Sequence, residues 1–130
     1  MCIRDSGRIL LVEDHPVNQR LAELMLRQLG LTAILVGDGS MALEMMQREH
    51  FDAVLLDCHL PGMDGYQVAR LHRARESGVH LPIIAVTADA LPADRARALA
   101  AGMDDHLAKP FTLDQLRVML ARYLERGSNG

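Results

Sequence analysis

Five polar residues stand at the ends of predicted strands, and their types suit phosphate chemistry. The apolar run at 53–56 ends on an aspartate, the runs at 8–12 and 82–86 end on two acids and a threonine, and a short strand expected at 105–108 ends on a lysine. Short apolar runs bounded by turn formers are typical of strands buried on both faces. Because the carboxyl ends of parallel strands share one edge of a sheet, we expect the five side chains to converge there. They are Glu13, Asp14, Asp57, Thr87 and Lys109.

This combination indicates phosphoryl transfer to an aspartate. Three carboxylates in one pocket repel one another, and a cation relieves that repulsion. Mg²⁺ is the usual choice where oxygen ligands and phosphate occur together. Lys109, the only lysine in the sequence, supplies a compact positive charge, and Thr87 supplies a hydroxyl. A single aspartate at a strand end is more often a turn or capping residue than a nucleophile, but polar ends on four strands reverse that preference.

The elements that must position these residues alternate along the chain. Strands are expected at 8–12, 32–36, 51–57, 82–86 and 105–108. Helices are expected at 16–29, 40–49, 66–76 and 92–101, and a last helix follows the capping residue Thr112 and directs Leu113, Leu116, Leu120 and Leu124 to the core. Such alternation predicts a single α/β domain in which five helices cover both faces of a five-stranded parallel sheet.

The composition fits one globular domain and excludes several classes of function. The chain has 130 residues, of which 49% are hydrophobic, and a formal net charge of −3. The mild acidity argues against direct nucleic-acid binding. No apolar stretch approaches the roughly 18 residues that cross a bilayer, so we expect no membrane insertion of this piece. The two cysteines, Cys2 and Cys58, show no metal or disulfide spacing, which favours a reducing cytoplasm. We divide the chain into a disordered or non-native leader at 1–7, a domain at 8–125, and a tail or linker start at 126–130.

Four motifs together resemble the receiver domain of bacterial two-component response regulators. They are LLVEDHPVNQ at 10–19, VLLDCHLPGMDG at 54–65, PIIAVTADA at 82–90 and GMDDHLAKPF at 102–111. The resemblance covers residues 8 to about 125. The motif sequences are closer to those of receivers fused to hybrid sensor kinases than to those of receivers fused to DNA-binding domains. It implies a flavodoxin-like sheet with strand order 2-1-3-4-5.

The resemblance also implies a role for each residue at the strand ends. Asp57 would be the phosphoacceptor, Thr87 and Lys109 would hold phosphoryl oxygens, and the Lys109–Pro110 peptide bond would be cis. Mg²⁺ is the implied cofactor. Its ligands would be Asp14, Asp57, the main-chain carbonyl of His59 and, through water, Glu13.

The implied function is that of a phosphoacceptor in a two-component phosphorelay. The donor would be a phosphohistidine on a histidine kinase or a histidine phosphotransfer domain. Thr87 and His106 would be switch residues that alter the face made by the fourth helix, fifth strand and fifth helix. His59 and Asp89 would tune the lifetime of the phosphoryl group. The chain would be free or part of a hybrid sensor kinase, and a monomer or a weak phosphorylation-dependent dimer.

Position 106 departs from the family pattern, because His stands where Tyr or Phe is usual. A smaller, titratable ring would weaken the switch or make it sensitive to pH, unless it is a tolerated variant. Two other functions remain as alternatives. One is a phosphatase of the haloacid dehalogenase type, which needs a second aspartate where His59 stands. The other is a binding module that works without phosphorylation. As a receiver, the chain would have no enzymatic activity beyond its own phosphorylation and dephosphorylation.

Overall fold

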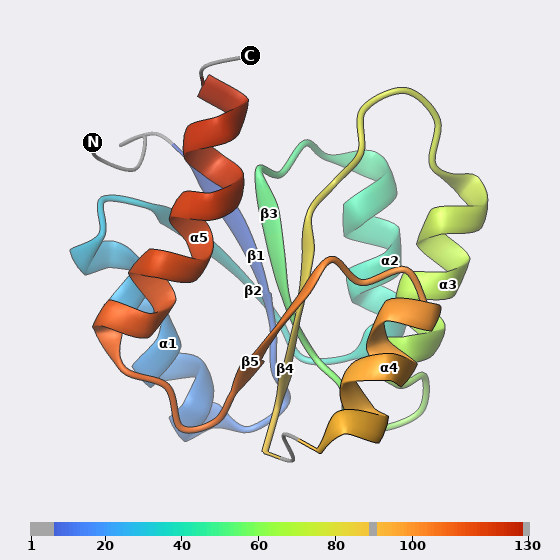
Figure 1. The fold of residues 1–130 in the computed structure, drawn as a ribbon, viewed down its shortest axis with the longest axis horizontal. Coiled ribbons are helices and arrows are strands. Elements are labelled where there is room, and N and C mark those ends of the chain that lie inside the picture. The colour runs from blue at the N-terminus through green and yellow to red at the C-terminus, as the bar shows by residue number, and fades with distance from the viewer. Residues whose placement is uncertain (1–6, 89–90, 129–130) are drawn as a thin grey trace.

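The computed structural model describes residues 7–88 and 91–128, where five strands alternate with five helices (Figure 1). The strands are β1 (Arg8–Val12), β2 (Thr32–Val36), β3 (Ala53–Asp57), β4 (Ile83–Thr87) and β5 (Asp105–Ala108). The helices are α1 (Pro16–Gln28), α2 (Gly39–Arg48), α3 (Gly65–Arg75), α4 (Pro92–Ala100) and α5 (Leu113–Ser128). The predicted α/β class is confirmed.

The strands form one parallel sheet in the order β2-β1-β3-β4-β5, as the resemblance implied. Figure 1 shows α1 and α5 on one face of the sheet and α2, α3 and α4 on the other. Each parallel connection therefore crosses a face through a helix. The register pairs Val12 of β1 with Leu56 of β3. The residues that follow these two positions consequently emerge together at the carboxyl edge of the sheet.

The central strands are buried on both faces because their apolar residues run without interruption. Every residue of β3 and β4 is buried. Since neighbouring side chains point to opposite faces, Leu10 and Val54 join the core under α2, α3 and α4, whereas Ile9 and Leu55 join the core under α1 and α5. Two apolar layers thus hold the polar strand ends in place.

Side chains cap the helices that flank the carboxyl edge. The Asp38 carboxylate accepts a hydrogen bond from the Met41 N–H at 2.7 Å, so α2 begins at Gly39, one residue before the predicted start. Asp64 and Gln67 form a capping box at the start of α3. At α5, the predicted cap is confirmed, because the Gln115 N–H donates to Thr112 Oγ1 at 3.1 Å.

The apolar residues of α1 divide between core and surface. Ala22 and Leu26 are buried against the sheet. Val17, Leu21 and Leu24 keep 67%, 51% and 41% of their surface exposed. The apolar periodicity predicted the helix correctly, but only part of the apolar stripe faces the core. The rest forms an apolar surface that starts close to the end of β1.

The last helix departs from the prediction at both ends. Leu116, Leu120 and Leu124 are buried, but Leu113 is 36% exposed, so the prediction that it faces the core was wrong. Leu113 is the first helical residue and precedes the turn that packs on the sheet. The helix continues to Ser128, past the predicted end of the domain. Residues 1–6 and 129–130, which belong to the predicted leader and tail, lie outside the described residues. No helix of the described residues is long and apolar enough to cross a membrane.

Candidate functional site

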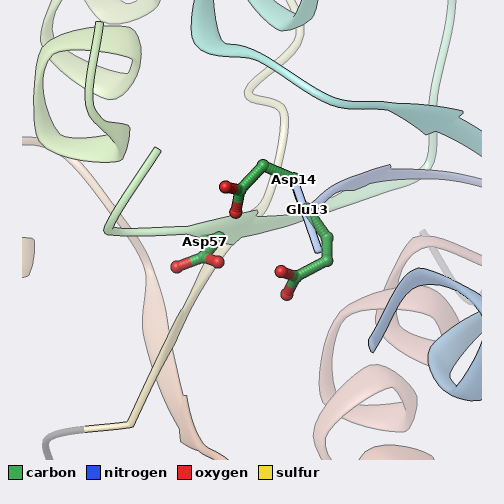
Figure 2. A group of neighbouring side chains, drawn as sticks. All are labelled: Glu13, Asp14 and Asp57. Carbon is green, nitrogen blue, oxygen red and sulfur yellow. The ribbon is translucent and has the colours of Figure 1, made fainter. Parts of the chain in front are cut away.

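Three acidic side chains meet at the carboxyl edge of the sheet (Figure 2). Glu13 and Asp14 follow the last residue of β1, and Asp57 is the last residue of β3. One carboxylate oxygen from each lies within 4.8 Å of the others. Glu13 and Asp57 are 5% and 4% exposed, whereas Asp14 is exposed. The convergence expected for these acids is therefore observed.

Lys109, which follows the last residue of the edge strand β5, joins the acidic group. Its Nζ donates to Glu13 Oε1 at 2.9 Å and to Asp57 Oδ2 at 3.0 Å. Partial burial alone would lower the pKa of Lys109, but the hydrogen bonds to Glu13 and Asp57 outweigh it and raise that pKa. The Lys109–Pro110 peptide bond is cis, as expected. The charged ammonium of Lys109 is therefore hydrogen-bonded to Asp57, the carboxylate that was predicted to be the nucleophile.

The Asp57 carboxylate is held at both oxygens. The backbone N–H of His59 donates to Oδ1 at 2.9 Å, and Lys109 donates to Oδ2. The start of α3 packs directly against the same strand end, because a Cβ on Gly65 would lie 2.4 Å from the Asp57 carbonyl oxygen. A glycine at position 65 thus lets the helix approach the strand closely.

Thr87 ends β4 at the same edge, with 1% of its surface exposed. In the sheet register it pairs with Ala108, the residue before Lys109, and the Lys109 N–H donates to the Thr87 carbonyl at 2.8 Å. Thr87 therefore lies on β4, the strand next to β3, which carries Asp57. His106 lies in β5, one strand further away, half-buried, and its Nε2 has no hydrogen-bond partner in the described residues. Asp89 lies outside the described residues.

A second group of side chains, which the sequence did not single out, connects this edge to α4. The Tyr66 hydroxyl and the Cys58 thiol form a hydrogen bond, and Arg97 of α4 stacks over the Tyr66 ring at 4.1 Å. Burial and this hydrogen bond raise the pKa of Tyr66 to about 12. Burial likewise raises the pKa of Cys58, so the residue after Asp57 stays a neutral thiol. The contact links the residue beside Asp57 to the helix that begins at Pro92.

Glu13 has further partners that sequence reasoning also missed. Its Oε2 accepts from the His15 N–H at 3.1 Å, and its main-chain carbonyl accepts from Gln19 Nε2. Gln19 is the last residue of the first motif, and this position was the only signal in the sequence, because six residues separate it from Glu13 and that is not a helical spacing. These bonds fix the loop that carries the first two acids.

The group fits a hard divalent cation. Its three carboxylates carry three negative charges against the single ammonium of Lys109, which leaves a net charge of about −2. The ligand atoms are carboxylate oxygens, which Mg²⁺ prefers. One of the acids is exposed, so a bound ion would keep contact with water and with a substrate oxygen. When bound, Mg²⁺ would neutralise charge on phosphoryl oxygens.

The fold and this edge define the class of the protein. Residues 9–121 match the family model described as the response regulator receiver domain, and the chain belongs to that family.

Individual relatives agree with the family. The chain is 43% identical over 122 residues to the sensor histidine kinase RcsC of Escherichia coli, a match that covers 94% of the chain and 13% of RcsC. The chain thus spans only a small part of this much longer relative. The receiver domain of a sensor histidine kinase from Pseudomonas aeruginosa PAO1, solved with magnesium coordinated in its active site cleft, is 50% identical, with a TM-score of 0.86 and coverage of 92% of this chain and 98% of that one.

A further solved structure includes a partner. The receiver domain of Ssk1 from Saccharomyces cerevisiae, crystallised with the histidine phosphotransfer protein Ypd1, is 25% identical to this chain. Its TM-score is 0.86, and the match covers 94% of this chain and 91% of that one.

Proposed function

We propose that this chain accepts a phosphoryl group on Asp57 from a phosphohistidine, in the presence of Mg²⁺. The observation that carries the proposal is the meeting of three carboxylates with Lys109, whose Nζ lies 3.0 Å from Asp57 Oδ2. The magnesium ion in the Pseudomonas receiver domain and the Ypd1 partner of Ssk1 support it. A phosphorelay role as part of a hybrid sensor kinase follows from the similarity to RcsC.

The residues divide between metal binding and phosphoryl binding. We assign Asp14, Asp57 and the main-chain carbonyl of His59 as direct Mg²⁺ ligands, and Glu13 as a ligand through water. Glu13 is suited to an indirect role because it is buried and already accepts hydrogen bonds from Lys109 and from the His15 N–H. Thr87 and Lys109 would bind phosphoryl oxygens, since both stand at the ends of strands on the same side of Asp57.

The transfer breaks one bond and forms one. A carboxylate oxygen of Asp57 attacks phosphorus, the P–N bond to the donor imidazole breaks, and the imidazole leaves with the electron pair of that bond. The product is an acyl phosphate. Water later attacks phosphorus, which releases inorganic phosphate and restores the carboxylate. Lys109 offsets the negative charge on the phosphoryl oxygens during both steps.

Phosphorylation would switch the surface formed by α4, β5 and α5. The phosphoryl group carries about 1.5 to 2 negative charges in place of the single charge of the Asp57 carboxylate, so it would attract the Thr87 hydroxyl, and His106 in the neighbouring strand would reorient. Apolar side chains are exposed on this surface, namely Leu91 just before α4, Leu99 on α4 and Val118 on α5, at 62%, 62% and 43%. A change in their arrangement would change partner preference.

The phosphodonor would contact α1. Val17 and Leu21 are exposed apolar residues on the helix that starts three residues after Glu13. A cavity of about 300 Å³ lies beside them, with Leu21, Met25 and Phe111 in its apolar lining and Lys109 at one side. A donor histidine that reaches Asp57 brings its own helix against this surface. The exposed apolar area and its place beside the site favour a helical phosphotransfer partner.

We further propose the finer properties that the family implies. The chain would phosphorylate itself from small phosphodonors and hydrolyse its own acyl phosphate, with His59 and Asp89 setting the rate of loss. It would be cytoplasmic and monomeric, or a weak dimer when phosphorylated. A phosphatase of the haloacid dehalogenase type is disfavoured because His59, two residues beyond the nucleophile, contributes only its N–H to Asp57.

The test is the mass of the chain after incubation with acetyl phosphate and Mg²⁺. Wild type should gain one phosphoryl group, Asp57→Ala should gain none, and the exposed control Asp114→Ala should behave as wild type. A gain in Asp57→Ala, or turnover of a chromogenic phosphate ester, would overturn the proposal.

A second pair of variants tests the donor surface. Leu21→Glu should slow transfer from a phosphorylated phosphotransfer domain and leave labelling by acetyl phosphate unchanged. Leu99→Glu, at an exposed leucine on α4, should transfer at the wild-type rate. Equal effects of the two variants would place the donor elsewhere.

A further inference from the structure

Helix α4 is attached to the domain more weakly than α3, the helix beside it on the same face of the sheet. Ala98 is the only buried residue among the nine described residues of α4, whereas α3 buries five of its eleven. Within the described part of the chain, the residue before α4, Leu91, provides no capping hydrogen bond and is 62% exposed. Helices with few buried contacts belong to the least stable parts of a structure. A single further contact can therefore have a large share in placing α4.

The turn that follows α4 is fixed by Arg73 of α3. Its Nε donates to the Gly102 carbonyl at 2.8 Å, and its Nη2 donates to Asp104 Oδ2 at 2.8 Å. Asp104 Oδ2 also accepts from the Ile83 N–H, at the start of β4, at 2.8 Å. Gly102 has a φ of +100°, and a Cβ there would lie 2.6 Å from Arg73 Cγ, so this turn requires glycine. The carboxyl-terminal end of α4 is thus anchored.

Before this anchor, α4 is held by the stack of Arg97 on Tyr66. The Arg97 Cζ lies 4.1 Å from the ring centroid, and the ring is 2% exposed. Among the described residues, no other side chain of α4 makes a hydrogen bond, an ion pair or a ring contact. The Tyr66 hydroxyl is hydrogen-bonded to the thiol of Cys58, the residue after Asp57. The stack therefore connects a weakly held helix to the strand end that carries the phosphoacceptor.

The two attachments lie in order along α4. In Figure 1, α4 starts at the lower edge of the sheet, where β4 ends, and rises to the turn before β5. The anchored turn at Gly102 is therefore the far end of the helix, and the start of the helix lies at the edge that carries Asp57. If the stack opened, the start of α4 could move while its far end stayed fixed, as in a hinge motion.

We propose that the stack of Arg97 on Tyr66 holds α4 in the arrangement that accompanies the Asp57 carboxylate, and that α4 rotates about Gly102 when the stack opens. The link to phosphorylation rests on the proposed function. A phosphoryl group on Asp57 is larger and more highly charged than the carboxylate, and it stands one residue before Cys58, the hydrogen-bond partner of Tyr66. Because coupling between two sites is reciprocal, weakening the stack strengthens the binding of a phosphoryl mimic.

The first experiment measures amide hydrogen exchange of the full chain in EDTA, without any phosphoryl group. Arg97→Gln removes the cation and should raise the exchange rates of the α4 amides about two- to fivefold, the factor expected of an exposed cation–π contact. Arg and Gln have similar helix propensities, so the change tests the contact. Arg95→Gln, at an exposed arginine of the same helix, should exchange as wild type. Unchanged exchange in Arg97→Gln, or an equal rise in both variants, contradicts the proposal.

A double-mutant cycle separates the ring from the helix dipole, because Arg97 lies in the last turn of α4, where a cation is favourable in any case. Tyr66→Leu keeps an apolar side chain but removes the ring. In that background, Arg97→Gln should change the exchange of α4 less than it does in wild type. An equal effect in the two backgrounds would assign the whole effect to the dipole and overturn the proposal.

The second experiment tests the link to Asp57 with beryllofluoride, a phosphoryl mimic, titrated at saturating Mg²⁺ and followed by NMR. Arg97→Gln should bind it about two- to fivefold more tightly than wild type, and Arg95→Gln should match wild type. Faster exchange of α4 with unchanged or weaker beryllofluoride binding would overturn the link to phosphorylation. If wild type bound no beryllofluoride, the proposed function itself would fail, whereas the exchange rates would still decide whether Arg97 holds α4.

Discussion

Replacing Asp57 by Asn tests whether the acidic group is balanced by Lys109 and completed by a metal. The substitution keeps the size of the side chain and an oxygen that can accept from the His59 N–H. It removes one charge from a pocket in which the carboxylate oxygens lie within 4.8 Å of one another. It also removes the attraction to Lys109 Nζ at 3.0 Å. The two changes oppose each other.

Coulomb's law gives the size of each change. At an effective dielectric constant of about 20, the buried Glu13 repels Asp57 by about 3.5 kcal/mol at the outer limit of 4.8 Å within which their oxygens lie. The exposed Asp14 adds only about 1 kcal/mol, because water screens it. Attraction to Lys109 at 3.0 Å is about 5.5 kcal/mol. Asp57→Asn should therefore change the metal-free free energy of unfolding by only about 1 kcal/mol.

The effect of Mg²⁺ on stability should distinguish wild type from Asp57→Asn. A ligand at a hundred times its dissociation constant stabilises the native state by about 2.7 kcal/mol. Wild type should show this gain in urea denaturation with Mg²⁺ relative to EDTA, and Asp57→Asn should show little of it. Asp114→Asn, whose side chain is 74% exposed, should behave as wild type. An equal Mg²⁺ gain in Asp57→Asn, or a loss of several kcal/mol in EDTA, would refute the reasoning.

Four further changes test separate parts of the structure. Lys109→Met should strengthen Mg²⁺ binding, because a competing cation leaves Glu13 and Asp57, yet slow labelling by acetyl phosphate about 100-fold or more; weaker Mg²⁺ binding in a titration would contradict this. Gly65→Ala should lower the free energy of unfolding in urea by about 1 to 3 kcal/mol, because the added Cβ would lie 2.4 Å from the Asp57 carbonyl oxygen. Gly37→Ala is the control: its Cβ would make only an ordinary contact at 3.9 Å, so the free energy of unfolding should change by less than about 0.5 kcal/mol. Burial lowers the pKa of His72 in the folded protein. The stability that its neutral form contributes is therefore complete above about pH 6.5 and is lost as the pH falls towards the folded pKa. His72→Phe should flatten the pH profile of the urea midpoint over that range. His106→Tyr should remove any dependence of phosphorylation-dependent partner binding on pH between about 6 and 8; an unchanged profile would sink the hypothesis of a titrating switch.

The sequence predicts the sheet and its polar edge well for a specific physical reason. Strands buried on both faces need uninterrupted apolar residues, so a charged residue such as Asp57 can stand only where the strand ends. Parallel topology then brings such ends together whatever their separation along the chain. Glu13 and Lys109, which are 96 residues apart, consequently form a hydrogen bond.

The packing of helices is less visible in the sequence. Leu21 and Leu26 are both apolar residues of α1, yet one is half exposed and the other is buried. Which of them faces the sheet depends on the rotation of the helix about its axis, and a stripe broader than the contact leaves that rotation undefined. The stacking of Arg97 on Tyr66 is missed for a similar reason, because it requires the relative position of α3 and α4.

The bonds of Lys109 bear on how the site could accelerate transfer. In the structure its ammonium already stabilises the Asp57 carboxylate, which by itself makes that oxygen a weaker nucleophile. An interaction raises the rate only by the amount that it strengthens in the transition state. Glu13 Oε1 holds the ammonium 2.9 Å away on the other side, so the lysine remains in place when Asp57 gives up its charge to phosphorus. We therefore propose that the buried Glu13 positions Lys109, which would give the second acid at the end of β1 a role even if it contacts the metal only through water.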